Sequence, residues 1–427
     1  MKMIWQGRRS RWSLASVGAV AAMLMVTSAC GGGDSSSDST PGVTDDTIVL
    51  GTTQPLTGAA APAYKMISDA MTAYFEYVND NGGVHGRKIE FIVEDDAYDP
   101  SKTVEKTRKL IQQDKVFAIV ASLGTPTHTA VLDFLRQNKV PDLFPSSGST
   151  SWNQPDKYPY TFGWQPDYIQ EGKILAHFVK EEHPDLTPCF FGQGDDQGTD
   201  GKKGVELVLG EGALKHTETY TVSNTNVSPQ IGKLQAEGCE VVYSFSLAGF
   251  NALALEAANK LGYKPLWVTG SGGADVASLT SYLKGNAAPL EGMLTNSYLP
   301  VDPENSWIKL FQEINADYND DAAFTLTLLY GYAKGFTVVQ ALHEAGEDLT
   351  REGLVEAMMT ADFEGPGLLP ATYAKGDHSG YGGSAVSRSE DGVPSIVSPV
   401  FTTDSADGPV EPSTAEPVEA TADGLPK

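Results

Sequence analysis

KIEFIVEDDAYDPSKTVEKTRKLIQQDKVFAIVAS, residues 88–122, is the stretch that decides the fold. Residues 88–95 alternate between apolar and polar side chains, which predicts a strand. A helix should follow, because Asp99 stands at an N-cap position and Pro100 at the first helical position. Residues 117–121 are apolar and suit a buried strand. A strand, a helix and a second strand in this order predict two parallel strands of one sheet with a helical crossover.

The same alternation continues on both sides of this stretch. Before it, residues 47–51 suit a short buried strand, and residues 63–83 carry apolar side chains at the three- and four-residue spacing of a helix. After it, residues 126–139 predict a helix and residues 140–144 another strand. Strands that alternate with helices of this length form a parallel sheet that helices cover on both faces.

The pattern pauses and then restarts in the second half of the chain. Four more strand candidates lie at 188–193, 218–222, 240–246 and 265–270. Further helices should begin at Tyr168, Gly198, Ser228 and Ala248. The sequence therefore predicts an α/β fold of two doubly wound parallel-sheet lobes, joined by a hinge near residues 162–164. Later helical segments at 306–319, 322–346 and 350–359 should pack back onto these lobes.

Each lobe is expected to take two pieces of the chain. We expect lobe 1 to comprise residues 45–163 and 296–362. Lobe 2 should comprise residues 164–295 and 363–402. The last stretch, 403–427, is rich in Pro, Ala and acidic residues and has no periodicity, which predicts a disordered acidic tail.

The N-terminal segment has the composition of an export signal. Basic side chains within the first 11 residues precede an apolar stretch at 12–26, which is too short to span a membrane. This stretch leads through small residues to Cys30, an ending that resembles the signal of a bacterial lipoprotein. We therefore expect a signal peptide at 1–29, lipidation of Cys30 and a flexible linker at 30–44. An ordinary signal with an accidental cysteine is the alternative.

Acidic side chains dominate the composition. The chain has 55 Asp and Glu against 30 Lys and Arg, a net charge of −25, and loss of the four basic residues of the signal would bring it near −29. Such a surface repels phosphate groups, which excludes nucleic acid as a partner. It also repels anionic lipid, so any membrane attachment would depend on the lipid anchor alone.

Four motifs together carry a resemblance to a known family. They are GGVHGRKIE at 82–90, EDDAYDP at 94–100, the Gly-Thr pair that opens a helix at 124–125, and VPDLFPSS at 140–147. With these motifs, residues 47–362 are similar to the type I periplasmic binding proteins, in particular the branched-chain amino acid type that feeds ABC importers. The resemblance implies two lobes that close on a small solute, an ABC permease and ATPase as partners, and no cofactor.

Two loops of lobe 1 are candidates for ligand contact. Gly124 and Thr125 precede a proline at the start of a helix, where N–H groups and a hydroxyl face the cleft of such a fold. Ser146, Ser147 and Gly148 follow a strand and align with the second ligand-contacting loop of the family. Plain N-capping and an ordinary turn are the alternatives for these two loops.

Lobe 2 departs from the amino-acid-binding pattern. Family members place an acid where this chain has Ser271, and the nearest carboxylate is Asp275. An aromatic residue is also absent at Leu247 and at the residue after it. Gln197, which stands where the family has an aromatic residue, and Tyr64 complete the candidate site. Because a buried ammonium needs a partner, aromatic or aliphatic acids and amides join amino acids as expected ligands.

Other chemistries have little support in the sequence. The loop GQGDDQG at 192–198 lies between a strand and a helix like a dinucleotide loop, but Asp195 and Asp196 would repel a pyrophosphate. The chain has no G-x-S-x-G elbow and no H-E-x-x-H pair, and its seven histidines are scattered singly. The acidic runs at 94–99 and 317–321 do not fit an EF-hand and predict a solvated surface. We therefore expect neither an enzyme nor a metal site.

Cys189 and Cys239 remain once Cys30 is assigned to lipidation. Each stands at the beginning of a predicted strand of lobe 2, and these two strands are neighbours in a doubly wound sheet of order 2-1-3-4-5. A disulfide between them is expected in an oxidising compartment. Two buried free thiols are the alternative.

These expectations combine into one interpretation. The chain should be a monomeric solute-binding lipoprotein on the outer face of the cell membrane, which captures a small organic solute and delivers it to an ABC importer. A ligand sensor of the same fold, which reports to a signalling partner, is the alternative.

Overall fold

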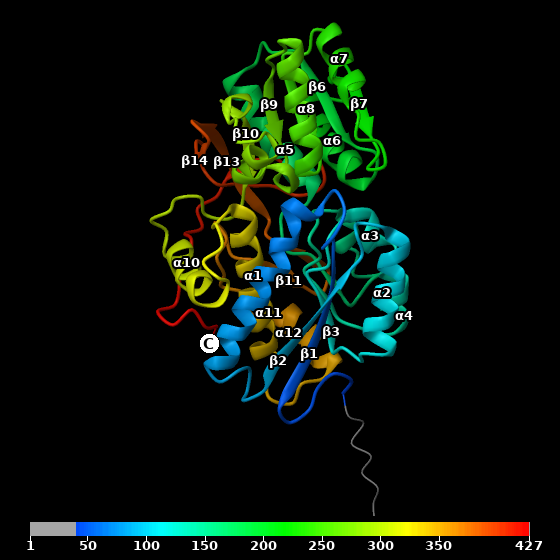
Figure 1. Ribbon diagram of the computed structural model, residues 1–427, viewed down its shortest axis with the longest axis vertical. Coiled ribbons are helices and arrows are strands. Elements are labelled where there is room, and N and C mark those ends of the chain that lie inside the picture. Colours follow the sequence, from blue (N-terminus) through cyan, green and yellow to red (C-terminus); the bar gives the residue numbers. More distant parts are fainter. Residues whose placement is uncertain (1–39, 427) are drawn as a thin grey trace, which may run out of the picture. The chain divides into compact units, whose positions relative to one another are not determined.

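The computed structural model describes residues 40–426, so the signal segment, Cys30 and most of the linker lie outside the described part. Lobe 1 is built on a parallel sheet with the strand order β2-β1-β3-β4-β5. Figure 1 labels its first three strands, β2, β1 and β3. Its strands are β1 Thr47–Gln54, β2 Lys88–Asp95, β3 Ala118–Val120, β4 Asp142–Leu143 and β5 Thr161–Phe162. The predicted crossover from β2 to β3 is confirmed, with β1 paired between them.

The helices of lobe 1 come from both ends of the described chain. They are α1 Ala61–Asp80, α2 Pro100–Gln112, α3 Thr125–Thr129, α4 Leu132–Gln137, α10 Ser306–Tyr318, α11 Leu326–Glu344 and α12 Arg351–Thr360. Asp99 caps α2 as expected, since its side chain accepts hydrogen bonds from Ser101 N and Lys102 N. α11 lies against α1 (Figure 1), where a Cβ at Gly331 would come within 2.6 Å of the Ile67 carbonyl oxygen.

The helix expected at 126–139 is interrupted between α3 and α4. The hydroxyls of Thr127 and Thr129 donate to the carbonyl oxygens of Leu123 and Thr125, four residues earlier. Such side-chain bonds compete with the backbone hydrogen bonds of a helix and favour a break. α3 is therefore only five residues long.

Lobe 2 repeats the parallel arrangement of lobe 1. Its parallel strands are β6 Pro188–Gln193, β7 Thr217–Tyr220, β8 Val241–Phe245, β9 Leu266–Thr269 and β10 Leu294–Ser297, in the order β7-β6-β8-β9-β10. Its helices are α5 Tyr168–Glu182, α6 Asp196–Leu209, α7 Ser228–Ala236, α8 Ala248–Leu261 and α9 Val276–Tyr282. The α/β fold with two doubly wound parallel sheets is thus confirmed.

Antiparallel strands extend the lobe 2 sheet beyond β10, and the sequence analysis did not predict them. They are β13 Gly383–Glu390, β14 Val393–Ile396, β15 Phe401–Thr402 and β16 Glu411–Pro412. Part of the range 363–402, which was assigned to lobe 2, forms a separate hairpin of β11 Thr372–Ala374 and β12 Asp377–Gly380 that packs on lobe 1. There, the Gly163 N–H donates to the His378 carbonyl oxygen at 2.8 Å. The chain therefore returns to lobe 2 between β12 and β13, about 20 residues later than the expected boundary at 362/363.

The structure corrects the expectation of a disordered tail at 403–427. β16 pairs with β15, and the buried ammonium of Lys173 binds the Asp404 carboxylate at 2.8 Å. Further on, the tail packs on lobe 1, where Trp307 Nε1 donates to the Val418 carbonyl oxygen and the Tyr74 hydroxyl to that of Gly424. The tail mostly supplies backbone groups to side chains elsewhere, so its own sequence needs no periodic pattern.

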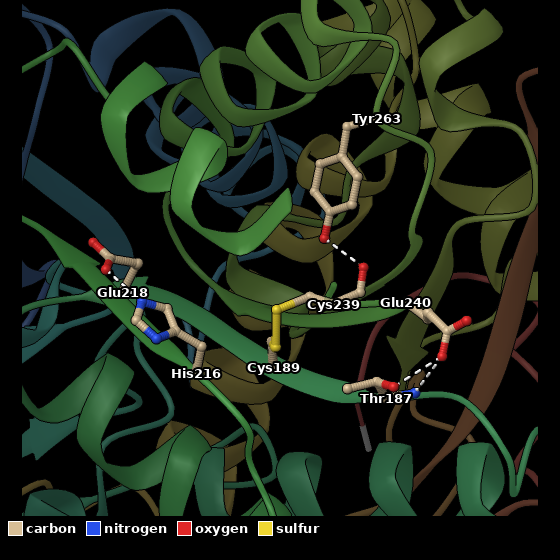
Figure 2. The surroundings of a disulfide bond; sticks show 7 residues. All are labelled: Thr187, Cys189, His216, Glu218, Cys239, Glu240 and Tyr263. Atoms are coloured by element: carbon tan, nitrogen blue, oxygen red, sulfur yellow. Dashed lines mark hydrogen bonds and ion pairs between the residues drawn. A yellow bond between two sulfur atoms is a disulfide. The ribbon is translucent and has the colours of Figure 1, made fainter. Parts of the chain in front are cut away.

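Cys189 and Cys239 form a disulfide with a Cα–Cα distance of 5.7 Å (Figure 2). Cys189 lies in β6, and Cys239 precedes β8, which pairs directly with β6. The Tyr263 hydroxyl donates to the Cys239 carbonyl oxygen at 2.8 Å and holds this strand start. Within residues 40–426, no helix combines the length and the apolar character that a membrane crossing requires.

Candidate functional site

A cavity lies between the two lobes at the carboxyl ends of their parallel strands. Its empty volume is about 950 Å³ when the part that opens to solvent is included. Nine of the ten predicted contact residues line it, namely Tyr64, Gly124, Thr125, Ser146, Ser147, Gln197, Leu247, Ser271 and Asp275. Gly148 does not: it packs behind the wall, where a Cβ would come within 2.9 Å of the Tyr168 ring. Loops after β3, β4, β6, β8 and β9 supply this lining, as expected for ligand sites in open α/β sheets.

Two hydroxyls form a buried pair on the lobe 1 wall. Thr125 Oγ1 and Ser147 Oγ lie 2.7 Å apart, and the Ser147 hydroxyl also accepts from the Ser149 N–H. Gly124 has a φ of 105°, and a Cβ there would come within 2.5 Å of the Tyr98 ring. Only glycine allows the backbone to approach the ring this closely. The pair can offer hydroxyl groups to a ligand in the cavity.

Ser146 has a different role, because its hydroxyl is already committed. It donates to the Ala121 carbonyl oxygen at 2.8 Å and accepts from Lys334 Nζ at 3.1 Å. Lys334 lies on α11 and is fully buried, and burial holds its pKa well below the usual value. Sequence reasoning missed this lysine, although a single cation within the apolar run of residues 326–344 is an unusual pattern for a buried helix.

A carboxyl group does reach the Ser271 position of lobe 2, but it comes from another helix. Glu171 on α5 is fully buried, and its Oε2 accepts from the Ser271 N–H at 2.8 Å. The Ser271 hydroxyl lies 2.5 Å from Glu171 Oε1. Burial raises the pKa of Glu171 to about 8, so the group is mostly protonated at neutral pH. No sequence signal predicted it, because a glutamate in the first turn of a helix usually faces solvent.

Asp275 lines the cavity, but hydrogen bonds already occupy its carboxylate. It caps α9 by accepting from the Ala277 N–H at 3.1 Å, and it accepts from the Ser278 hydroxyl at 2.9 Å. The Thr327 hydroxyl on α11 of lobe 1 donates to it at 2.8 Å. Asp275 therefore links the two lobes. This structural role accounts for a carboxylate at this position and does not require a ligand ammonium.

Tyrosines and amides that the sequence analysis did not single out complete the lining. Tyr98, Tyr168, Tyr298, Tyr330, Gln165 and Asn296 are among them. Asn296 on β10 is buried, and neither of its amide atoms has a hydrogen bond partner among the described residues. Buried polar groups in proteins are nearly always paired, so the unpaired amide of this lining residue is a candidate partner for a ligand. The tyrosine rings add flat apolar surface, which suits a ligand with an apolar body.

The motifs that resembled a dinucleotide loop or a calcium site have structural roles. In the loop at 192–198, Asp195 accepts from Gln197 N and caps α6. In the acidic run at 94–99, Asp95 accepts from the backbone of Leu56 and Thr57. Among residues 40–426, no three His, Cys, Asp or Glu side chains gather as a metal site requires. These acidic residues stabilise loops and helix starts.

Comparison with known proteins gives a consistent result. The model of a family described as periplasmic binding protein matches residues 47–393. The Leu/Ile/Val-binding protein homolog 7 of Brucella melitensis biotype 1 is 25% identical over 236 residues, 53% of this chain and 59% of the relative. The match thus spans less than two thirds of that relative's length.

Two further proteins match over more of their length. The leucine-, isoleucine-, valine-, threonine- and alanine-binding protein of Pseudomonas aeruginosa is 25% identical over 75% of this chain and 84% of its own. Among solved structures, a fatty acid ABC transporter substrate-binding protein from Thermomonospora curvata aligns with a TM-score of 0.76 and 25% identity. That alignment covers 87% of this chain and 97% of the other.

Proposed function

The chain belongs to the periplasmic binding protein family, as a type I member of the branched-chain amino acid type, and from this premise we propose that it captures a small organic solute and delivers it to an ABC importer. Attachment through a lipidated Cys30 on the outer face of the membrane is part of the proposal, as is an ABC permease and ATPase complex as partner.

One observation carries this proposal. The cavity between the lobes is lined with hydroxyls and tyrosines, and the buried side chain of Asn296 beside it has no hydrogen bond partner among residues 40–426. A polar group that is buried without a partner destabilises the protein by about 1–3 kcal/mol, whereas a ligand that pairs with it removes that penalty. Such a cavity suits reversible capture between two lobes.

We propose a monocarboxylate with an apolar body as the ligand. The hydroxyl pair of Thr125 and Ser147 can donate to a carboxylate, and the tyrosine rings can cover an aliphatic or aromatic group. Glu171, the carboxyl group that reaches Ser271 in the described part of the chain, is mostly protonated at neutral pH, which disfavours a ligand ammonium there. The similar proteins are named for both kinds of ligand: the Pseudomonas aeruginosa protein for amino acids and the Thermomonospora curvata protein for a fatty acid.

Closure of the lobes is the proposed mechanism. The chain passes between the lobes after β5, after β10 and after β12, and we propose these three segments as the hinge; the tail crosses once more, after β16, to reach lobe 1. Tyr64, Asp275 and Thr327 then join the two lobes beside the cavity. We propose that the permease recognises this closed form.

A ligand screen tests the proposal. The mature chain, with Cys30 replaced by serine, is titrated with aliphatic and aromatic monocarboxylates, the matching amides, branched-chain amino acids and sugars. Thermal unfolding identifies binders, because a ligand at a hundred times its Kd stabilises the folded state by about 2.7 kcal/mol. At least one monocarboxylate should bind, and its recovery unchanged after long incubation would agree with binding without turnover. A chain that binds no member of the screen would argue against the proposal.

A further inference from the structure

Lys334 is a buried cation that the proposed site does not yet explain. It lies on α11 with no solvent exposure, and its Nζ donates to the Phe144 carbonyl oxygen at 2.5 Å and to Ser146 Oγ at 3.1 Å. The ammonium also lies 4.6 Å from the Tyr330 ring centroid and 5.3 Å from that of Trp164. These neighbours satisfy hydrogen bonds and offer ring faces, but none of them carries a negative charge.

Among the described residues, Lys334 has no ion-pair partner. Within residues 40–426, no carboxylate lies at ion-pair distance from Lys334 Nζ. Asp142 is close enough to raise the pKa of Lys334 slightly against the effect of burial. Its carboxylate, however, is already hydrogen-bonded to His128 and to the Thr161 hydroxyl. Lys173, the other deeply buried lysine, does have a partner, Asp404 at 2.8 Å. Buried charges are usually paired, so Lys334 lacks a counter-charge that Lys173 has.

The position of Lys334 indicates where a counter-charge could come from. Ser146 and Tyr330 both line the cavity, and both also contact the ammonium. The proton of the Ser146 hydroxyl is committed to the Ala121 carbonyl oxygen, so only its lone pairs remain and it cannot donate to a ligand. Lys334 is thus one side chain away from the cavity. Burial lowers the pKa of Lys334, and a carboxylate bound in the cavity would favour the charged ammonium and attract it more strongly than in bulk water.

We infer that Lys334 is a specificity-determining residue, whose buried charge makes the cavity prefer a carboxylate over an uncharged amide of the same shape. The inference rests on the proposed function and goes beyond it by naming the group that sets the charge preference. Lys334 acts through space and across Ser146, so it is a positioning and field-supplying residue and does not itself contact the ligand.

Matched acid and amide pairs test the inference. The probes are 4-methylpentanoate with 4-methylpentanamide, and benzoate with benzamide, titrated calorimetrically into the mature chain. We expect the wild-type chain to bind the acid of at least one pair about tenfold more tightly than the amide, because a charge interaction of only about 1.4 kcal/mol gives that ratio. In Lys334→Met this preference should disappear, through weaker binding of the acid and little change for the amide.

Two further variants separate charge from structure. Lys334→Gln keeps a donor for the Phe144 carbonyl oxygen and removes the charge, so it should lose the preference even if the methionine variant folds poorly. Lys173→Met removes the other buried lysine, which does not line the cavity, and should keep the acid preference.

The outcomes distinguish this inference from the proposed function. Equal weakening of acid and amide in both Lys334 variants would show a structural role only and overturn the inference. A wild-type chain that binds amides as tightly as acids would also overturn it, while leaving solute binding intact. A chain that binds none of the probes, and nothing in the wider screen, would remove the proposed function and this inference together.

Discussion

The Tyr64 hydroxyl donates a hydrogen bond of 2.7 Å to the Gly272 carbonyl oxygen, and Tyr64 and Gly272 belong to different lobes. The same hydroxyl accepts from the Ala248 N–H at 2.9 Å, at the first residue of α8. One side chain from α1 thus satisfies two backbone groups of lobe 2 beside the cavity. The lobes are in direct contact in this structure, so Tyr64 stabilises the closed arrangement.

Replacing Tyr64 with phenylalanine should therefore weaken ligand binding. The change leaves the Ala248 N–H and the Gly272 carbonyl without this partner in the closed form, at a cost of about 1–2 kcal/mol, or roughly five- to thirtyfold in Kd. Calorimetric titration measures the loss. Tyr282→Phe is the control, because its hydroxyl makes only a 3.4 Å contact with the Ala59 carbonyl oxygen between the lobes. Equal losses in both variants would contradict a specific role for Tyr64.

Asn296→Leu should weaken ligand binding without lowering the stability of the ligand-free chain. The wild-type amide is buried without a partner, so an apolar side chain of similar size should leave the free energy of unfolding of the ligand-free chain unchanged or raise it by about 1–3 kcal/mol. Affinity should fall, because the ligand loses a hydrogen-bonding group. Chemical denaturation and titration of the same preparation give both numbers. A less stable variant with unchanged affinity would mean that Asn296 serves the fold.

Glu171 should make stability depend on pH. Its pKa in the folded chain is about 8, above the usual value of 4.5, so the folded state binds more protons than the unfolded state between these values. The contribution of protonated Glu171 to the free energy of unfolding is fully present below about pH 4.5 and is lost as pH rises through about 8. Within this window the free energy of unfolding should fall by about 1.4 kcal/mol per pH unit from this group.

The difference between wild type and Glu171→Gln isolates that contribution. The variant keeps a neutral group beside Ser271, so it should gain stability relative to wild type as pH rises from 5 to 8. Urea unfolding at several pH values measures this difference. Parallel curves for the two proteins would show that Glu171 is ionised in the folded chain already at low pH.

Ending the chain after residue 413 should destabilise lobe 1. The deleted segment accepts hydrogen bonds from Trp307 Nε1 at 2.6 Å and from the Tyr74 hydroxyl at 2.8 Å, and its Ala420 and Leu425 pack against the core cluster that contains both rings. Loss of these bonds and of the buried apolar area should lower the free energy of unfolding by about 2–4 kcal/mol. Thermal unfolding checks this, with Lys309→Ala, which removes only an exposed ion pair, as a control for surface changes on α10. An unchanged midpoint would restore the disordered tail that composition suggested.

Local signals in the sequence were enough to predict most of the parallel framework. The strand at Lys88–Asp95 and the helix that Asp99 caps were recognised because alternation and capping involve only neighbouring residues. Strands β13 to β16 were not, since they are short or contain polar residues and depend on pairing partners far along the chain. The tail was mistaken for disorder for the same reason.

The candidate site shows the same division between local and distant causes. Thr125 and Ser147 stand in loops after predicted strands, so their place beside the cavity followed from the expected fold and the family resemblance. Glu171 and Lys334 could not be assigned, because whether a charged helical residue is buried depends on what packs against that helix. The acid missing at Ser271 is supplied by α5, which no spacing in the sequence indicates.

We propose that the cavity between the lobes binds a monocarboxylate through the hydroxyl pair of Thr125 and Ser147. Calorimetric titration of the mature chain and of the Thr125→Ala/Ser147→Ala variant with the acid panel tests it most directly. We expect one ligand per wild-type chain for at least one acid, and binding at least about tenfold weaker in the variant, because one hydroxyl of the pair donates to the other and the variant removes the remaining hydroxyl proton that the pair can donate to a carboxylate. Equal affinity in both proteins, or no acid bound by the wild type, would contradict the claim.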